Sequence, residues 1–142
     1  MAADKHGAAT LLGFDYGTRR IGVAVGQQVT GTASALETVP VRDGRPDWAR
    51  IEALIHTWQP HALVVGIPYH MDGKAQPMTE SARRFARQLH GRFGLPVHEA
   101  DERLSSWAAE QLPAAAGRRD DIDALAAQLI LQDWLHSEAR DA

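Results

Sequence analysis

The sequence predicts an α/β fold, a mixed five-stranded sheet with three antiparallel strands followed by two parallel strands and helices on both faces. Short apolar runs joined by tight turns fill roughly the first forty residues, which favours an antiparallel meander. The remainder alternates helical periodicity with apolar runs, which favours parallel strands joined by crossover helices. With no internal repeat or linker, we expect a flexible N-terminus over residues 1–10 and one domain over residues 11–139.

The first three strands are predicted from apolar and β-branched runs. Residues 11–15 form an apolar run that ends at a turn, and residues 21–25 form a second run whose glycines could let another backbone come close. Residues 32–39 are small and β-branched, which indicates a third strand. Their tight connections favour an antiparallel meander.

The later elements alternate between helix and strand. We first expect a helix behind Pro46, with Trp48 and Trp58 on its buried face, and then a strand over 62–67. A second helix is opened by Pro77 and ended by Gly91 and Gly94, and a strand over 95–100 follows it. The last two elements are a helix capped by Ser105 or Ser106 that ends near Pro113 and a closing helix over about 122–139. The buried stripe of the closing helix is predicted to be Ile122, Leu125, Ala126, Leu129 and Ile130.

Composition narrows the class of protein. The chain is 44% hydrophobic and 23% charged, as in globular proteins, and it has no apolar run near the roughly 20 residues of a membrane span. The absence of cysteine removes thiolate metal sites and cysteine nucleophiles, and with no secretory signal we expect a cytoplasmic protein. The net charge of −3 argues against bulk coating of nucleic acid but not against action at one site.

Three acids lie where the predicted elements converge. Asp15 ends the first strand, Glu102 follows the strand over 95–100, and Asp123 begins the closing helix. Sites in such sheets form beyond the carboxyl ends of the parallel strands. Clustered carboxylates that hold Mg²⁺ or Mn²⁺ supply the charge and the activated water that phosphodiester hydrolysis needs. One such acid alone is more often a cap or turn residue, and three together favour a metal site.

Basic residues accompany these acids. Arg19 and Arg20 follow the first acid and Arg103 follows the second, where a planar guanidinium could hold a phosphate. In the loop after the strand over 62–67, Asp72 precedes a glycine and is better explained by a turn than by metal binding. His70, in the same loop, is more often a surface residue than a proton-transfer group.

Several segments together resemble one family. LLGFDYGTRRIGVAVG, LVVGIPYHMDGKAQP, HGRFGLPV, ADERLSS and IDALAAQLILQDWL occur in the order and type of the YqgF/RuvX family of pre-16S ribosomal RNA nucleases and Holliday-junction-resolvase-like proteins. The resemblance spans about Leu11 to Leu135 and implies a ribonuclease H-like fold. It also implies a metal-dependent nuclease with Asp15, Glu102 and Asp123 as its acids, acting on precursor ribosomal RNA, in contact with ribosomal particles.

Two departures from related proteins stand out. Junction resolvases carry an acid at the end of the fourth strand, whereas this chain has Gly66 to Pro68 there, so Glu102 takes that place. Relatives often have a longer lysine-rich segment before the third acid, and here Arg118 and Arg119 are its basic residues. We expect both arginines to contact substrate.

Three other functions stay open. The resemblance fits a Holliday junction resolvase acting on branched DNA, which would call for a two-fold dimer, and no dimer surface can be read from the sequence. Asp15 to Thr18 also matches the Asp-x-Gly-Thr loop of nucleotide-binding ATPases. A non-catalytic nucleic-acid-binding module is the third, although a pure binder gains nothing from mutually repelling carboxylates.

Overall fold

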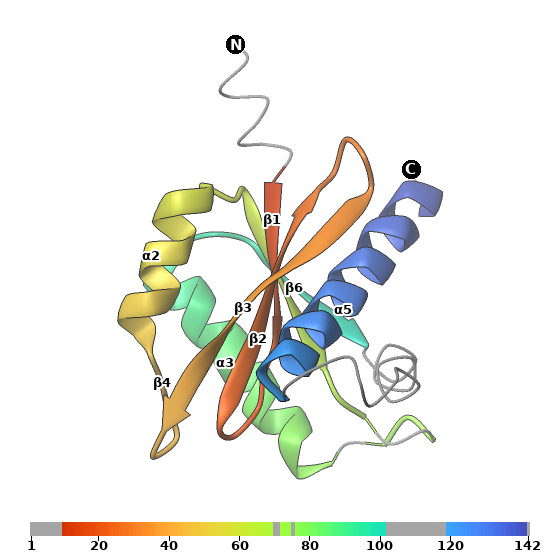
Figure 1. The fold of residues 1–142 in the computed structure, drawn as a ribbon. Helices are drawn as coiled ribbons and strands as arrows, with labels where there is room; N and C mark the ends of the chain where they lie inside the picture. Colours follow the sequence, from red (N-terminus) through yellow and green to blue (C-terminus); the bar gives the residue numbers. More distant parts are fainter. Residues whose placement is uncertain (1–9, 70–71, 75, 102–118, 142) are drawn as a thin grey trace.

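The computed structural model describes residues 10–69, 72–74, 76–101 and 119–141 (Figure 1). A six-stranded sheet runs in the order β4-β3-β2-β1-β5-β6. Its strands are β1 (Thr10–Asp15), β2 (Arg20–Gln27), β3 (Thr32–Arg42), β4 (Arg45–Pro46), β5 (Ala62–Ile67) and β6 (Val97–Asp101). The described helices are α2 (Trp48–Trp58), α3 (Pro77–Phe93) and α5 (Arg119–Asp141).

The pairing confirms the predicted mixed sheet. Strand β1 is antiparallel to β2, and β2 is antiparallel to β3, whereas β5 is parallel to β1 and β6 is parallel to β5. The predicted number of five strands was one too low. The additional β4 closes a tight hairpin on β3 through Asp43 and Gly44, both at positive φ. Two residues are too few for a periodic signal, which explains why it was missed.

Pro77 opens α3 as predicted, whereas the start of α2 is set by a capping residue and not by Pro46. Pro46 lies in β4, and α2 begins after Asp47, whose carboxylate accepts the Arg50 backbone N–H. Gly94 ends α3 in the left-handed conformation, whereas Gly91 lies inside that helix and does not end it. The helix expected between Ser105 or Ser106 and Pro113 lies outside the described residues.

The two faces of the sheet bury separate clusters of side chains. Figure 1 shows the helices that cover each face. Helices α2 and α3 cover one face, where Phe14 meets Phe85 edge-on with ring centroids 5.7 Å apart. Helix α5 covers the other face, where Leu131 lies among alanines and aliphatic residues. Trp48 packs against the first cluster as predicted, but Trp58 is 37% exposed and is not a core residue. No helix of the described part of the chain is long and apolar enough to cross a membrane.

The buried stripe of α5 differs from the predicted one. Ile122 is 38% exposed, and the residues buried on this helix are Ala124, Ala127, Ile130, Leu131 and Leu135. The helix rests on β2, where Gly22, Ala24 and Gly26 leave little space. Small alanines therefore face the sheet near the start of the helix. Of the predicted stripe, Ile130 is buried as expected, whereas Leu125, Ala126 and Leu129 are only partly buried.

Candidate active site

Strand register fixes the position of Asp15. Asp15 is the last residue of β1 and pairs with Gly22 on one side and with Gly66 on the other. The carboxylate therefore originates at the centre of the sheet, at the carboxyl end of two parallel strands. Directly paired residues on antiparallel strands project to the same face, so Asp15 and the missing side chain of Gly22 share a face.

That face is the one covered by α5. A Cβ atom added to Gly22 would lie 1.9 Å from the backbone carbonyl oxygen of Asp123. No side chain fits between β2 and the first turns of α5, so glycine is required here by close backbone approach. Through Gly22 the fold brings Asp123, more than a hundred residues away in sequence, beside the strand end that carries Asp15.

Arg20 and Asp123 form an ion pair at this junction. The Nε–H of Arg20 donates to Oδ2 of Asp123 at 2.6 Å, with the two side chains 29% and 25% exposed. Arg20 lies two residues before Gly22 on β2 and so shares its face. Sequence reasoning placed Arg20 near phosphate but missed this pairing. The glycine in the strand interior was the signal that another backbone comes close.

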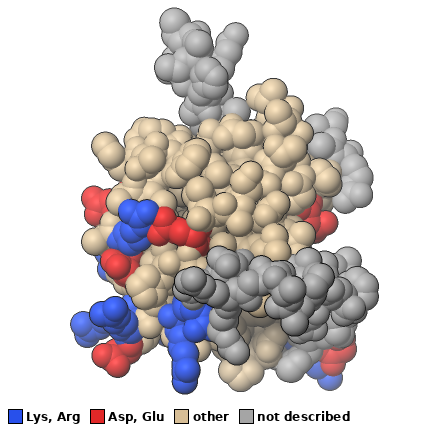
Figure 2. Space-filling view, in the orientation of Figure 1, with Lys and Arg blue, Asp and Glu red and all other residues tan. Residues whose placement is uncertain are grey.

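Other predicted site residues differ in how far they are described. Arg19 is exposed in the turn between β1 and β2. Figure 2 shows Lys and Arg side chains, with Asp and Glu among them, in the lower part of the molecule. Arg119 is the first residue of α5, and its side chain is not among those that the structure describes. Glu102, Arg103 and Arg118 lie outside the described residues, Glu102 being next in the chain after the last residue of β6.

The donor chemistry at the strand end suits a hard divalent cation. Asp15 and Asp123 offer carboxylate oxygens, the ligands that Mg²⁺ and Mn²⁺ prefer. Among the described residues no group of three or more His, Asp or Glu side chains could hold a metal ion. Two carboxylates alone would be an incomplete ligand set for such an ion.

The loop after β5 behaves as a turn. The Lys74 backbone N–H donates to Oδ1 of Asp72 at 2.9 Å, which confirms the predicted turn role. His70 lies outside the described residues. On α3, Arg87 pairs with Glu80 at 2.9 Å, and this contact lowers the pKa of the Glu80 carboxyl group.

A mixed sheet of this order, with helices on both faces, defines a ribonuclease H-like protein. Among solved structures, Thermus thermophilus RuvC in complex with a Holliday junction substrate matches with a TM-score of 0.57 and 19% identity, over 92% of this chain and 95% of that one. Thermus thermophilus RuvC alone matches with a TM-score of 0.54 and 16% identity. At such low identity the likeness shows the fold.

Family membership comes from the sequence comparison. The model of the RuvX family, described as Holliday junction resolvase, matches residues 9–137, and the chain belongs to this family. This confirms the resemblance inferred from the motifs.

Curated relatives are similar over almost their whole length. A protein of Azotobacter vinelandii is 54% identical over 91% of this chain and 94% of its own. One of Yersinia enterocolitica is 48% identical over 92% of this chain and 96% of its own. Both bear the name "Putative pre-16S rRNA nuclease".

Proposed function

We propose that this chain is a metal-dependent endonuclease that hydrolyses phosphodiester bonds in the maturation of the 5′ end of precursor 16S ribosomal RNA. Membership of the RuvX family makes it a hydrolase of nucleic-acid phosphodiester bonds, and the relatives' name supplies the RNA substrate. The observation that carries the proposal is the contact at Gly22, which sets the start of α5 and Asp123 beside the strand end of Asp15.

The proposed site joins these two acids with Glu102. The three carboxylates would hold Mg²⁺ or Mn²⁺, which when bound supplies an activated water and stabilises charge on the phosphate. The backbone position of Asp15 is set by strand pairing on both sides of β1. That of Asp123 is set by the close packing of the α5 backbone against Gly22. Strand pairing and helix packing thus fix the backbone positions of both acids, while the Asp123 carboxylate is shared with the Arg20 guanidinium.

Substrate binding falls to the surrounding arginines. We assign phosphate contacts to Arg19, Arg20, Arg103, Arg118 and Arg119. We also propose a single nuclease domain over residues 11–139 that works in the cytoplasm, beside ribosomal particles, since the relatives are named for a ribosomal RNA precursor. Resolution of branched DNA is the second candidate, supported by the family's description as a Holliday junction resolvase.

The deciding experiment compares substrates and metals. Purified protein should cleave precursor 16S ribosomal RNA in Mg²⁺ or Mn²⁺, faster than synthetic four-way junctions. Cleavage should stop in excess chelator, because the proposed nucleophile is a metal-activated water. Faster cleavage of junctions would favour the resolvase. Undiminished cleavage in chelator, with contaminating nucleases removed, would exclude the metal mechanism.

Arg19 and Arg20 should behave differently when each is changed to glutamine. The Arg20 guanidinium pairs with a proposed metal ligand, so Arg20→Gln should tighten Mn²⁺ binding about three- to tenfold by removing a competing positive charge. Exposed Arg19 is the matched control, and Arg19→Gln should leave Mn²⁺ affinity unchanged while lowering the salt slope of RNA affinity by about one unit. Mn²⁺ titration followed by electron paramagnetic resonance and RNA binding at several salt concentrations measure both. Weaker Mn²⁺ binding in Arg20→Gln would mean that Arg20 orients Asp123 for the metal.

A further inference from the structure

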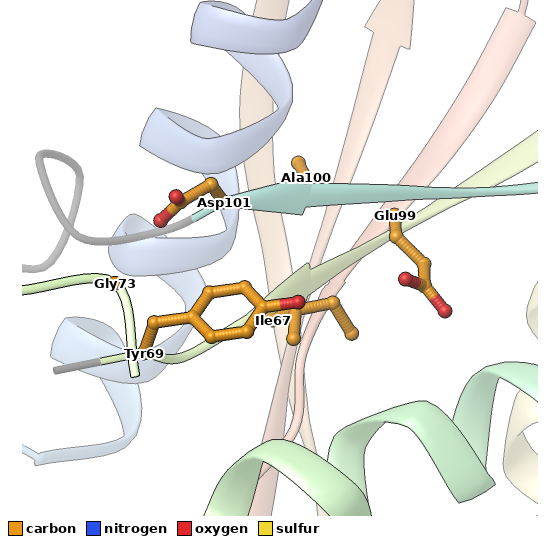
Figure 3. Close-up of a pocket in the computed structure, with 6 residues that line it drawn as sticks. All are labelled: Ile67, Tyr69, Gly73, Glu99, Ala100 and Asp101. Atoms are coloured by element: carbon orange, nitrogen blue, oxygen red, sulfur yellow. The ribbon is translucent and has the colours of Figure 1, made fainter. Parts of the chain in front are cut away.

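A pocket of about 460 Å³ opens at the carboxyl ends of β5 and β6. Its size is within the range of small-molecule sites. Figure 3 shows its lining, made by Ile67, Tyr69, Gly73, Glu99, Ala100 and Asp101. The pocket shares no residue with the junction of Asp15 and Asp123, so it needs an explanation of its own.

Strand register places this pocket close to the proposed metal site. Asp15 pairs with Gly66, and Gly66 pairs with Ala100, so Ala100 is two strands away from Asp15. Two strand spacings amount to about 10 Å. A nucleic-acid strand advances about 3.4 Å per nucleotide when stacked, so a phosphate at the acids has neighbouring nucleotides within reach of the pocket.

The pocket lies on the opposite face of the sheet from α5. His98 contacts Trp134 of α5, with ring centroids 4.9 Å apart. Because side chains alternate between the two faces along β6, Glu99 and Asp101 belong to the α3 face. A strand that enters the pocket from the acids therefore crosses the carboxyl end of the sheet. Such a path requires a nucleotide that leaves its stack, which single-stranded RNA permits.

Tyr69 supplies an aromatic surface that is held in place from α3. An Nη of Arg83 donates to the Tyr69 hydroxyl, and the guanidinium carbon lies 5.4 Å from the ring centroid. Arg83 is also 3.7 Å from Glu99, measured from Nε to Oε1. A ring fixed in this way can stack on a base with little further loss of side-chain entropy.

The polar groups of the pocket select what can enter. In Figure 3 the carboxylates of Glu99 and Asp101 lie on either side of the Tyr69 ring. Carboxylates accept hydrogen bonds and repel phosphate, so the pocket favours an uncharged group that carries donors. Guanine presents two adjacent donors, N1–H and N2–H, on its Watson–Crick edge, which match both oxygens of one carboxylate. Adenine, cytosine and uracil each place an acceptor beside their donor.

We propose that this pocket binds an unstacked guanine base of single-stranded RNA, with Tyr69 stacking on the base and Asp101 or Glu99 accepting from its Watson–Crick edge. The inference rests on the proposed function and adds to it a preference for guanine within about three nucleotides of the cleaved bond.

The test uses the full chain in Mg²⁺ with short RNAs that carry guanine, inosine or adenine at each position around one cleavage site. Inosine lacks only the 2-amino group. At one position we expect guanine to be cleaved about tenfold faster than inosine, and adenine to be slower still. Asp101→Asn or Glu99→Gln should reduce the guanine-to-inosine ratio to about two or less. A ratio is insensitive to a general loss of activity, which matters because Asp101 precedes Glu102.

Tyrosine variants separate stacking from structure. Tyr69→Leu should weaken binding of the guanine RNA about tenfold, whereas Tyr69→Phe keeps the ring and should retain base preference. Equal cleavage of guanine and inosine RNAs at every position, or unchanged binding of the guanine RNA by Tyr69→Leu, would overturn the inference while leaving the nuclease intact. Failure of the wild-type chain to cleave any RNA would overturn the proposed function and this inference with it.

Discussion

Asp15→Asn should reduce cleavage more than about a hundredfold without lowering the unfolding temperature of the metal-free protein. Asparagine keeps the shape of the side chain but cannot supply the charge that holds a divalent cation. Changes in groups that only support metal ligands already cost 10- to 100-fold, so loss of a ligand charge should cost more. The three acids of the proposed site would repel one another in the metal-free protein, and removing one charge would relieve that repulsion. Cleavage rates, Mn²⁺ titration and thermal unfolding give the three readouts.

For Asp123→Asn we expect a loss of stability in addition to the loss of activity. Activity should fall as far, but the metal-free protein should lose up to about 1 kcal/mol of stability because the ion pair with Arg20 is broken. Asp72→Asn is the matched control, since an asparagine oxygen can still accept the Lys74 N–H, and activity should stay near wild type. An inactive Asp72→Asn beside an active Asp15→Asn would place the site elsewhere. Unfolding of Asp15→Asn would make Asp15 a structural turn residue.

The sheet could be predicted because its buried strands consist of short runs of apolar residues. Residues 62–67 are apolar throughout, as expected for a central strand covered on both faces, and all six are buried. Asp15 was identifiable because an acid directly after an apolar run is unusual. Short β4 and the exposed Trp58 were not predictable, since two residues carry no period and a tryptophan at the end of a helix can extend past the core.

The placement of α5 depends on contacts between distant parts of the chain. Its sequence is apolar on several sides, so periodicity alone selected Ile122 and Leu125 in place of Ala124 and Ala127. The deciding constraint lies on β2, where Gly22 admits only a helix backbone. The ion pair between Arg20 and Asp123 depends on this packing of α5 against β2, and no local sequence pattern predicts it. Glu102, the third acid, is supported by its position directly after β6 and by the family resemblance.

Gly22→Ala should therefore damage both stability and the proposed site. The added Cβ would lie 1.9 Å from the Asp123 carbonyl oxygen and 3.0 Å from the Ala124 nitrogen, and both are backbone atoms that no rotamer change can move. Helix α5 must shift away from β2, which should cost about 3 kcal/mol in the free energy of unfolding. The molecules that still fold hold Asp123 away from Asp15, so Mn²⁺ affinity should fall at least about tenfold. Urea unfolding and Mn²⁺ titration measure the two effects.

Gly91→Ala is the control, because it makes the same chemical change where nothing lies within 4 Å of the new Cβ. It sits inside α3, where alanine is the better helix former, so stability should rise by about 0.5–1 kcal/mol and Mn²⁺ binding should not change. The contrast isolates the packing of α5 on β2 from the general effect of replacing glycine. If Gly22→Ala is as stable as wild type and binds Mn²⁺ as tightly, the close packing of α5 on β2 does not position Asp123. The proposed metal site would then lose the observation on which it depends.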